Sequence, residues 1–137
     1  MQTRAAAELV RLGGDPEGFV ARLLEPAHLE NADLVLAATL GVRGDTLGVF
    51  PRAMRRTFTL LEFAELCRAL PLEPGESAVD LVARAAAQRA SVAALDLDVP
   101  DPYGRSEETH RATADQIAAA VDAITHRLRP ALVEEGR

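Results

Sequence analysis

The sequence predicts an α/β fold in which a parallel sheet is flanked by helices, and three observations support this prediction. The short apolar run 32–38 lacks polar alternation, which is typical of a parallel strand buried on both faces. A second, shorter strand is predicted over 55–60. Segments with apolar residues at helical spacing precede, separate and follow these two runs. The length of 137 residues fits one domain, residues 1–137.

The composition excludes several classes of function. The formal net charge is −6, which argues against nucleic acid or an anionic membrane as partner, because both select a basic face. The single cysteine, Cys67, excludes an internal disulfide and a cysteine-based zinc cluster. No apolar run is long enough to span a bilayer, and the N-terminus does not have the pattern of a signal peptide. The cytoplasm is therefore the expected compartment.

The first half of the chain is expected to alternate between helices and the first strand. Apolar residues at helical spacing predict a helix over 5–12, and Gly13-Gly14 is expected to end it. Residues 17–24 fit neither a helix nor a strand, and Pro26 begins a short turn or helix. Three glycines within 41–48 weaken the helix that should follow the first strand, but they do not exclude it.

The second half is expected to be mostly helical. A helix over 60–70 follows the second strand, a loop over 71–75 ends it, and Ser77 is expected to cap the next helix. Residues 93–103 are acidic and contain prolines, which predicts a loop. Ser106 is expected to cap the last helix. The predicted apolar stripe of that helix consists of Ile117, Val121, Ile124 and Leu128.

This order of elements is unusual for an α/β domain. A sheet of two strands is small for a stable core. The chain also opens in a helix, whereas an α/β fold normally opens with a strand that becomes the centre of its sheet. The pattern predicts a fold whose first part is absent.

The most specific local motif is the heptapeptide 98–104. Prolines on both sides of Asp101 stiffen the backbone, and Gly104 permits a tight turn. Such a loop would present one carboxyl group beside the ring of Tyr103. A general acid needs this kind of fixed placement, because it transfers a proton only within hydrogen-bond reach. Taken alone, the same residues also fit an Asp-Pro turn before a capped helix.

The heptapeptide 98–104, followed by a long amphipathic helix, resembles the acid loop of low-molecular-weight protein tyrosine phosphatases. The stretches 32–39 and 55–64 resemble the same family and occur in the same order, so that the resemblance covers essentially the whole chain. It implies a phosphotyrosine-phosphatase-I-like fold, with a four-stranded parallel sheet of which the first two strands are missing here.

The resemblance also implies a reaction, the hydrolysis of a phosphomonoester through a phosphocysteine, with no metal and no other cofactor. By position, Asp101 would be the general acid that protonates the leaving phenolate oxygen and later activates water. Tyr103 would be the aromatic wall against which the substrate ring packs. The expected substrate of the full fold is a phosphorylated protein or a small phosphomonoester.

The chain departs from the family at the nucleophile. The Cys-x5-Arg loop should precede every matched segment, and it is absent. Cys67 does not substitute for it, because the residue six positions later is Glu73, which would repel a phosphate that arginine should bind. Cys67 also falls on the apolar face of a predicted helix, which indicates a place in the core. Val42 stands where many relatives have a histidine. No nucleophile and no metal ligand is predicted.

Two functions remain open from the sequence. The first is a truncated phosphatase of this family, inactive as written; a related arsenate reductase would need the same missing cysteine loop. The second is a non-catalytic interaction or binding protein derived from the fold. In both cases the apolar strand within 34–38 would leave one edge without a partner, which favours self-association.

Overall fold

The computed structural model describes the backbone of residues 1–135 and the side chains of residues 1–130. Its helices are α1 (Thr3–Arg11), α2 (Pro26–Glu30), α3 (Leu40–Val49), α4 (Leu60–Ala69), α5 (Ala78–Ala87) and α6 (Glu107–Glu135). Its strands are β1 (Val35–Ala37) and β2 (Thr57–Thr59), and its 3₁₀ turns are η1 (Pro51–Arg56) and η2 (Arg89–Ser91). Among the described residues, no helix combines the length and the apolar character that a membrane crossing requires.

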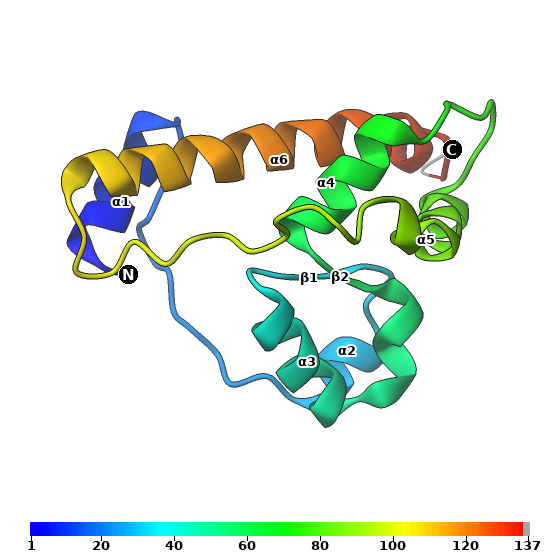
Figure 1. The fold of residues 1–137 in the computed structure, drawn as a ribbon, viewed down its shortest axis with the longest axis horizontal. Helices are drawn as coiled ribbons and strands as arrows, with labels where there is room; N and C mark the ends of the chain where they lie inside the picture. The colour runs from blue at the N-terminus through cyan, green and yellow to red at the C-terminus, as the bar shows by residue number, and fades with distance from the viewer. Residues whose placement is uncertain (136–137) are drawn as a thin grey trace.

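The two strands form a parallel sheet between two layers of helices. The register pairs Val35 with Thr57 and Ala37 with Thr59. Helices α2 and α3 lie on one side of the sheet, and α1, α4, α5 and α6 lie on the other (Figure 1). Two parallel strands require a crossover, which α3 and η1 provide. The predicted α/β class with a small parallel sheet and flanking helices is confirmed.

The core lies between the sheet and the layer of α4, α5 and α6. Phe58 of β2 and Phe63 of α4 are fully buried, and their ring centroids are 4.9 Å apart. Leu66, Leu81 and Ile124 contribute one apolar side chain from each of the three helices. These two rings are the largest fully buried side chains of the domain among the described residues.

Most helices begin at a side-chain cap that the sequence encodes locally. The predicted caps Ser77 and Ser106 are confirmed, because each hydroxyl accepts a hydrogen bond from the backbone N–H three residues later. Thr39 caps α3 in the same way. The C-terminal end of α4 is capped by a residue that is distant in the sequence, since Arg127 of α6 donates to the carbonyl oxygen of Cys67 at 2.7 Å.

Two expectations about the strands were wrong in detail. The first strand is not buried on both faces, since Leu36 is 39% exposed. A strand side chain points to one face of the sheet, and the helices do not fully cover the face to which Leu36 points. Arg55 and Arg56 belong to η1 and not to the second strand, because the 3₁₀ turn that starts at Pro51 continues up to Thr57.

The predicted apolar stripe of α6 is only half correct. Ile124 is buried and Leu128 packs against the core, but Ile117 and Val121 are 36% and 42% exposed. The buried side instead includes Ala120, whose small side chain lets α6 approach α4 closely. Close packing against α4 thus sets which face of α6 is buried, and this face is not the most apolar one. Periodicity alone does not encode this.

Candidate active site

The acid loop, residues 98–104, is fixed to the carboxyl end of β1 by two hydrogen bonds. The backbone N–H of Val99 donates to the carbonyl oxygen of Ala38 at 2.9 Å. The backbone N–H of Leu40 donates to Oδ1 of Asp98 at 2.7 Å, which also satisfies a free donor in the first turn of α3. Ligands of parallel α/β sheets bind beyond the carboxyl ends of the strands. The loop therefore lies at the end of the sheet where a substrate would be expected.

The base of the acid loop is buried and its tip is exposed. Leu97 and Val99 are 4% and 8% exposed, so that both are held in the body of the domain. Beyond them the chain turns outward, and both Asp101 and Tyr103 are exposed to solvent. A rigid base with an accessible tip can present a side chain to a ligand without burying its charge.

The conformation of the tip is set by local hydrogen bonds. Oδ1 of Asp101 accepts a hydrogen bond from the backbone N–H of Tyr103 at 2.9 Å, and the N–H of Arg105 donates to the carbonyl oxygen of Pro102 at 2.9 Å. Gly104 has φ of 71°, a left-handed conformation that glycine adopts without strain. Oδ2 of Asp101 accepts no hydrogen bond from any described residue, which leaves it available for proton transfer.

Asp101 and Tyr103, the two candidate site residues from the sequence, thus lie close together on one turn. Within residues 1–130 no ion pair joins Asp101 to a basic side chain. In the same part of the chain, no three His, Cys, Asp or Glu side chains are arranged to hold a metal ion. The arrangement provides a carboxyl group for proton transfer and an aromatic ring for packing, and the roles of Asp101 and Tyr103 stay predictions.

Cys67 lies in the core, as predicted, at 3% exposure on α4. Burial raises the pKa of its thiol to about 11 because it disfavours the thiolate, and the nearby charges of Arg127 and Arg68 oppose this shift only in part. A nucleophilic cysteine needs the opposite environment, which stabilises the thiolate. Cys67 is therefore neutral at physiological pH.

We expect Cys67 to react with a disulfide reagent at pH 8 about 10²-fold more slowly in the folded chain than in denaturant, because the folded state holds a smaller thiolate fraction. The raised pKa also means that, as the pH rises, the Cys67 thiol loses its proton in the unfolded chain before it does so in the folded chain. The free energy of unfolding should therefore decrease between about pH 9 and pH 11. Thiol titration measures the first effect, with Cys67→Ala as the blank. Equal rates in the folded and unfolded chain would contradict the assignment.

A buried ionic cluster at the carboxyl end of β2 is a feature that sequence reasoning missed. The carboxylate of Glu62 is 4% exposed and accepts two hydrogen bonds from Nη1 of Arg43, at 2.9 and 3.1 Å. Arg89 lies 3.9 Å from the same carboxylate and stacks on the ring of Phe58, with its guanidinium carbon 4.1 Å from the ring centroid. Burial lowers the pKa of Arg89, and the charge of Glu62 opposes that effect.

The cluster connects the elements that carry the acid loop. Glu62 lies in the first turn of α4, where it also accepts a hydrogen bond from the backbone N–H of Thr59. Arg43 lies in α3, whose first N–H is bound by Asp98 of the acid loop. The spacing from Thr59 to Glu62 is a capping-box signal that the sequence does contain. No local signal identifies Arg43 as the partner.

Comparison with known proteins supports the expected resemblance. No protein-family model matches the chain. A curated protein-arginine-phosphatase from Geobacillus stearothermophilus is 26% identical over 106 residues, which cover 77% of this chain and 53% of that protein. The chain therefore spans about half the length of the curated relative that it matches.

A solved structure matches the fold. The YwlE arginine phosphatase from Geobacillus stearothermophilus superposes with a TM-score of 0.68 and 24% identity, over 97% of this chain and 68% of that one. At this identity the superposition establishes the fold. In sequence and in fold, the predicted resemblance of this chain to the low-molecular-weight protein tyrosine phosphatases is confirmed.

Proposed function

We propose that this chain forms the acid-loop part of a phosphatase that resembles the low-molecular-weight protein tyrosine phosphatases. The observation that carries the proposal is the anchored loop 98–104, which two hydrogen bonds hold at the carboxyl end of β1. In this proposal Asp101 is the general acid and Tyr103 is the aromatic wall of the substrate site. The nucleophile is not among these 137 residues, because they contain no Cys-x5-Arg sequence.

The proposed chemistry uses Asp101 twice. A cysteine thiolate from a Cys-x5-Arg loop attacks phosphorus, and the leaving atom takes a proton from the carboxyl group of Asp101 as its bond to phosphorus breaks. The resulting carboxylate then takes a proton from the water that attacks the phosphocysteine, which releases inorganic phosphate and regenerates the thiolate. Both steps require a carboxyl group that is fixed and accessible: Oδ1 of Asp101 is held by the N–H of Tyr103, and the residue is exposed.

The proposed substrate is a phosphorylated protein or a small phosphomonoester. The curated relative is a protein-arginine-phosphatase by name. Phosphoarginine on a protein is therefore a specific candidate substrate, and its leaving guanidine nitrogen would also need a proton. The exposed ring of Tyr103, at 75%, can pack against a planar guanidine or a phenyl ring. The proposed compartment is the cytoplasm, which is the expectation from the sequence.

We expect the 137-residue polypeptide by itself not to hydrolyse p-nitrophenyl phosphate. A positioned general acid contributes only about 10²–10⁴-fold to a rate, and here it has no nucleophile to assist. Release of p-nitrophenolate by the purified chain, compared with a protein-free blank, measures this. Turnover that is lost in Asp101→Asn but kept in Asp96→Asn would show that the chain holds a nucleophile after all.

The second candidate function is a non-catalytic binding protein. The observation that favours it is the exposed apolar segment 19–24, in which Leu23 is 85% exposed. A contiguous exposed apolar surface more often marks an interaction site than an ordinary solvent-facing loop. A chain that gains no activity when a Cys-x5-Arg segment is supplied would favour this second function over the first.

A further inference from the structure

The 3₁₀ turn η1 carries three arginines within five residues, Arg52, Arg55 and Arg56. A 3₁₀ helix has three residues per turn, so that residues three positions apart lie directly above each other. Arg52 and Arg55 are both exposed and therefore form one stripe on the outer face of η1, about 6 Å apart along its axis. Ala53 is fully buried and marks the inner face. The pair Arg52 and Arg55, the arginine stripe, thus faces solvent.

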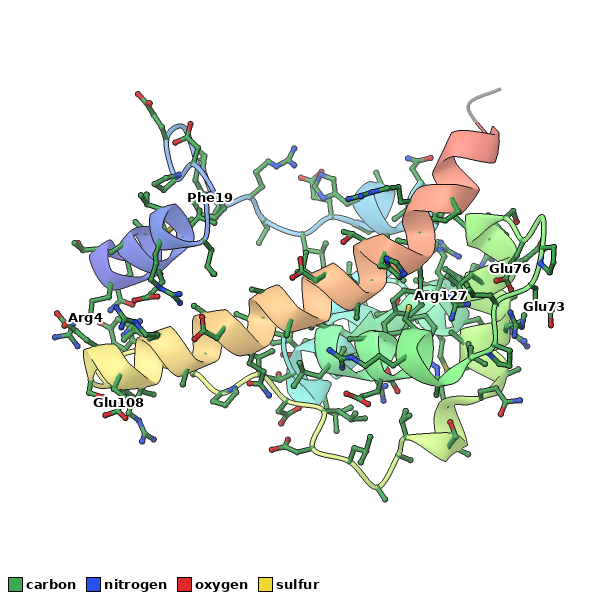
Figure 2. All side chains as sticks on the ribbon, turned by 90° about the horizontal axis from the view of Figure 1, so that it is seen from above. Arg4, Phe19, Glu73, Glu76, Glu108 and Arg127 are labelled. Carbon is green, nitrogen blue, oxygen red and sulfur yellow. The ribbon has the colours of Figure 1, made fainter. Side chains whose placement is uncertain are left out.

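The arginine stripe has no carboxylate partner. Within residues 1–130, no ion pair involves Arg52 or Arg55. Arginines on α1, α3, α4, α5 and α6 do pair with carboxylates. Figure 2 shows one such pair, Arg127 of α6 and Glu76, whose charged groups are 3.7 Å apart. Like charges on neighbouring positions of a helix repel each other, and an anion between them would relieve that repulsion.

The backbone that carries the stripe is held in place by other arginines. Arg56 donates to the carbonyl oxygen of Leu29 in α2 at 2.8 Å. Arg89 donates to the carbonyl oxygens of Met54 and Thr57, at 2.8 and 2.6 Å. A surface whose backbone is already fixed loses less conformational entropy when it binds a ligand. The turn η1 therefore presents its two exposed arginines from a preorganised backbone.

The arginine stripe lies at the opposite end of the sheet from the acid loop. The turn η1 leads into the amino end of β2, whereas the acid loop is anchored at the carboxyl end of β1. In Figure 1 η1 lies to the right of α3, and the acid loop extends to the left. The turn packs against α3, α5 and β2, and the edge of β1 without a described neighbour faces away from β2. A segment added at that edge would leave η1 exposed.

The charge and spacing of the stripe fit an extended acidic protein segment. Alternate side chains of an extended chain point to the same side and repeat about every 7 Å, close to the spacing of the stripe. Each guanidinium group can bind a carboxylate through two parallel N–H donors. Nucleic acid and anionic membranes need a wider basic face, which a chain of net charge −6 does not favour. We propose that Arg52 and Arg55 form a docking site for an extended acidic segment of a partner protein.

The proposal does not depend on the chemistry at Asp101, and peptide binding tests it on the chain as it is. The probe is a short fluorescein-labelled peptide in which glutamate alternates with serine, and its fluorescence anisotropy is measured against protein concentration at low ionic strength. We expect saturable binding that weakens about tenfold in the double variant Arg52→Ser with Arg55→Ser. Added salt should weaken binding to the unmodified chain. An unmodified chain that does not bind the peptide would overturn the proposal.

The matched control is the double variant Arg22→Ser with Arg105→Ser. Both arginines are exposed and form no ion pair within residues 1–130, so that the control loses the same charge from other parts of the surface. It is expected to bind the peptide as the unmodified chain does, and both double variants should keep the circular dichroism spectrum. Equal weakening in the two double variants would show that only net charge matters, which would overturn the site.

A second probe tests the class of the partner. A labelled single-stranded oligothymidylate with the same number of negative charges as the peptide is titrated under the same conditions. We expect it to bind more weakly than the peptide. Tighter binding of the oligothymidylate that is lost in Arg52→Ser with Arg55→Ser would assign the stripe to nucleic acid and overturn the proposed protein partner.

Discussion

Replacing Glu62 by alanine is expected to lower the free energy of unfolding by about 3 kcal/mol, since removing one partner of a buried ion pair leaves the other without compensation. The carboxylate lies 2.9 Å from Arg43 and 3.9 Å from Arg89. Both guanidinium groups retain some contact with solvent, which places the loss at the lower end of the range for buried pairs. The substitution also removes the acceptor for the backbone N–H of Thr59.

The matched control is Glu65→Ala on the same helix. Glu65 also pairs with an arginine, Arg68, but their side chains are 40% and 43% exposed. The control is expected to change the free energy of unfolding by about 0.5 kcal/mol or less. Urea denaturation at one fixed protein concentration measures both variants. Similar losses in the two variants would contradict the role of the buried cluster.

The order and type of the elements could be predicted because their causes are local. A short apolar run without polar alternation indicated the first strand, and apolar residues at helical spacing indicated several of the helices. Hydroxyl caps at Ser77 and Ser106 marked two helix starts that the structure contains. The exposure of Leu36 and the rotation of α6 could not be predicted. They depend on which elements lie next to each other, and a periodic pattern does not specify its neighbour.

The candidate site shows the same division between local and long-range causes. The acid loop was identifiable because its prolines, its aspartate and its glycine are contiguous. Its anchor was not, since the bond from Leu40 to Asp98 joins residues 58 positions apart. The pair of Arg43 and Glu62 spans 19 positions and has no local signature. The sequence therefore indicated the reactive carboxyl group, and the structure revealed what holds it in place.

A chimera should show the role of the acid loop in catalysis. It adds ahead of this chain a family-type segment with two strands and a Cys-x5-Arg loop. The added strand is expected to pair with the free edge of β1, which places its loop at the carboxyl end of the sheet near Asp101. In that chimera Asp101→Asn should lower the turnover of a phenyl phosphate with a poor leaving group by about 10²-fold or more.

Tyr103→Ala in the same chimera provides the matched comparison. Its ring is expected to pack against the substrate in both the ground state and the transition state, so that its loss should mainly raise KM and leave kcat nearly unchanged. Asp101→Asn should instead lower kcat, since proton transfer occurs only in the transition state. Steady-state kinetics separates the two effects.

The leaving-group dependence of turnover by the chimera and its Asp101→Asn variant tests the central claim most directly. A series of aryl phosphates with leaving phenols of increasing pKa is compared at one pH. If Asp101 is the general acid, the variant should fall further behind as the phenol becomes more basic, and p-nitrophenyl phosphate, with its activated leaving group, should be affected least. An active chimera whose rates are indifferent to Asp101→Asn across the series would show that Asp101 is only a turn residue.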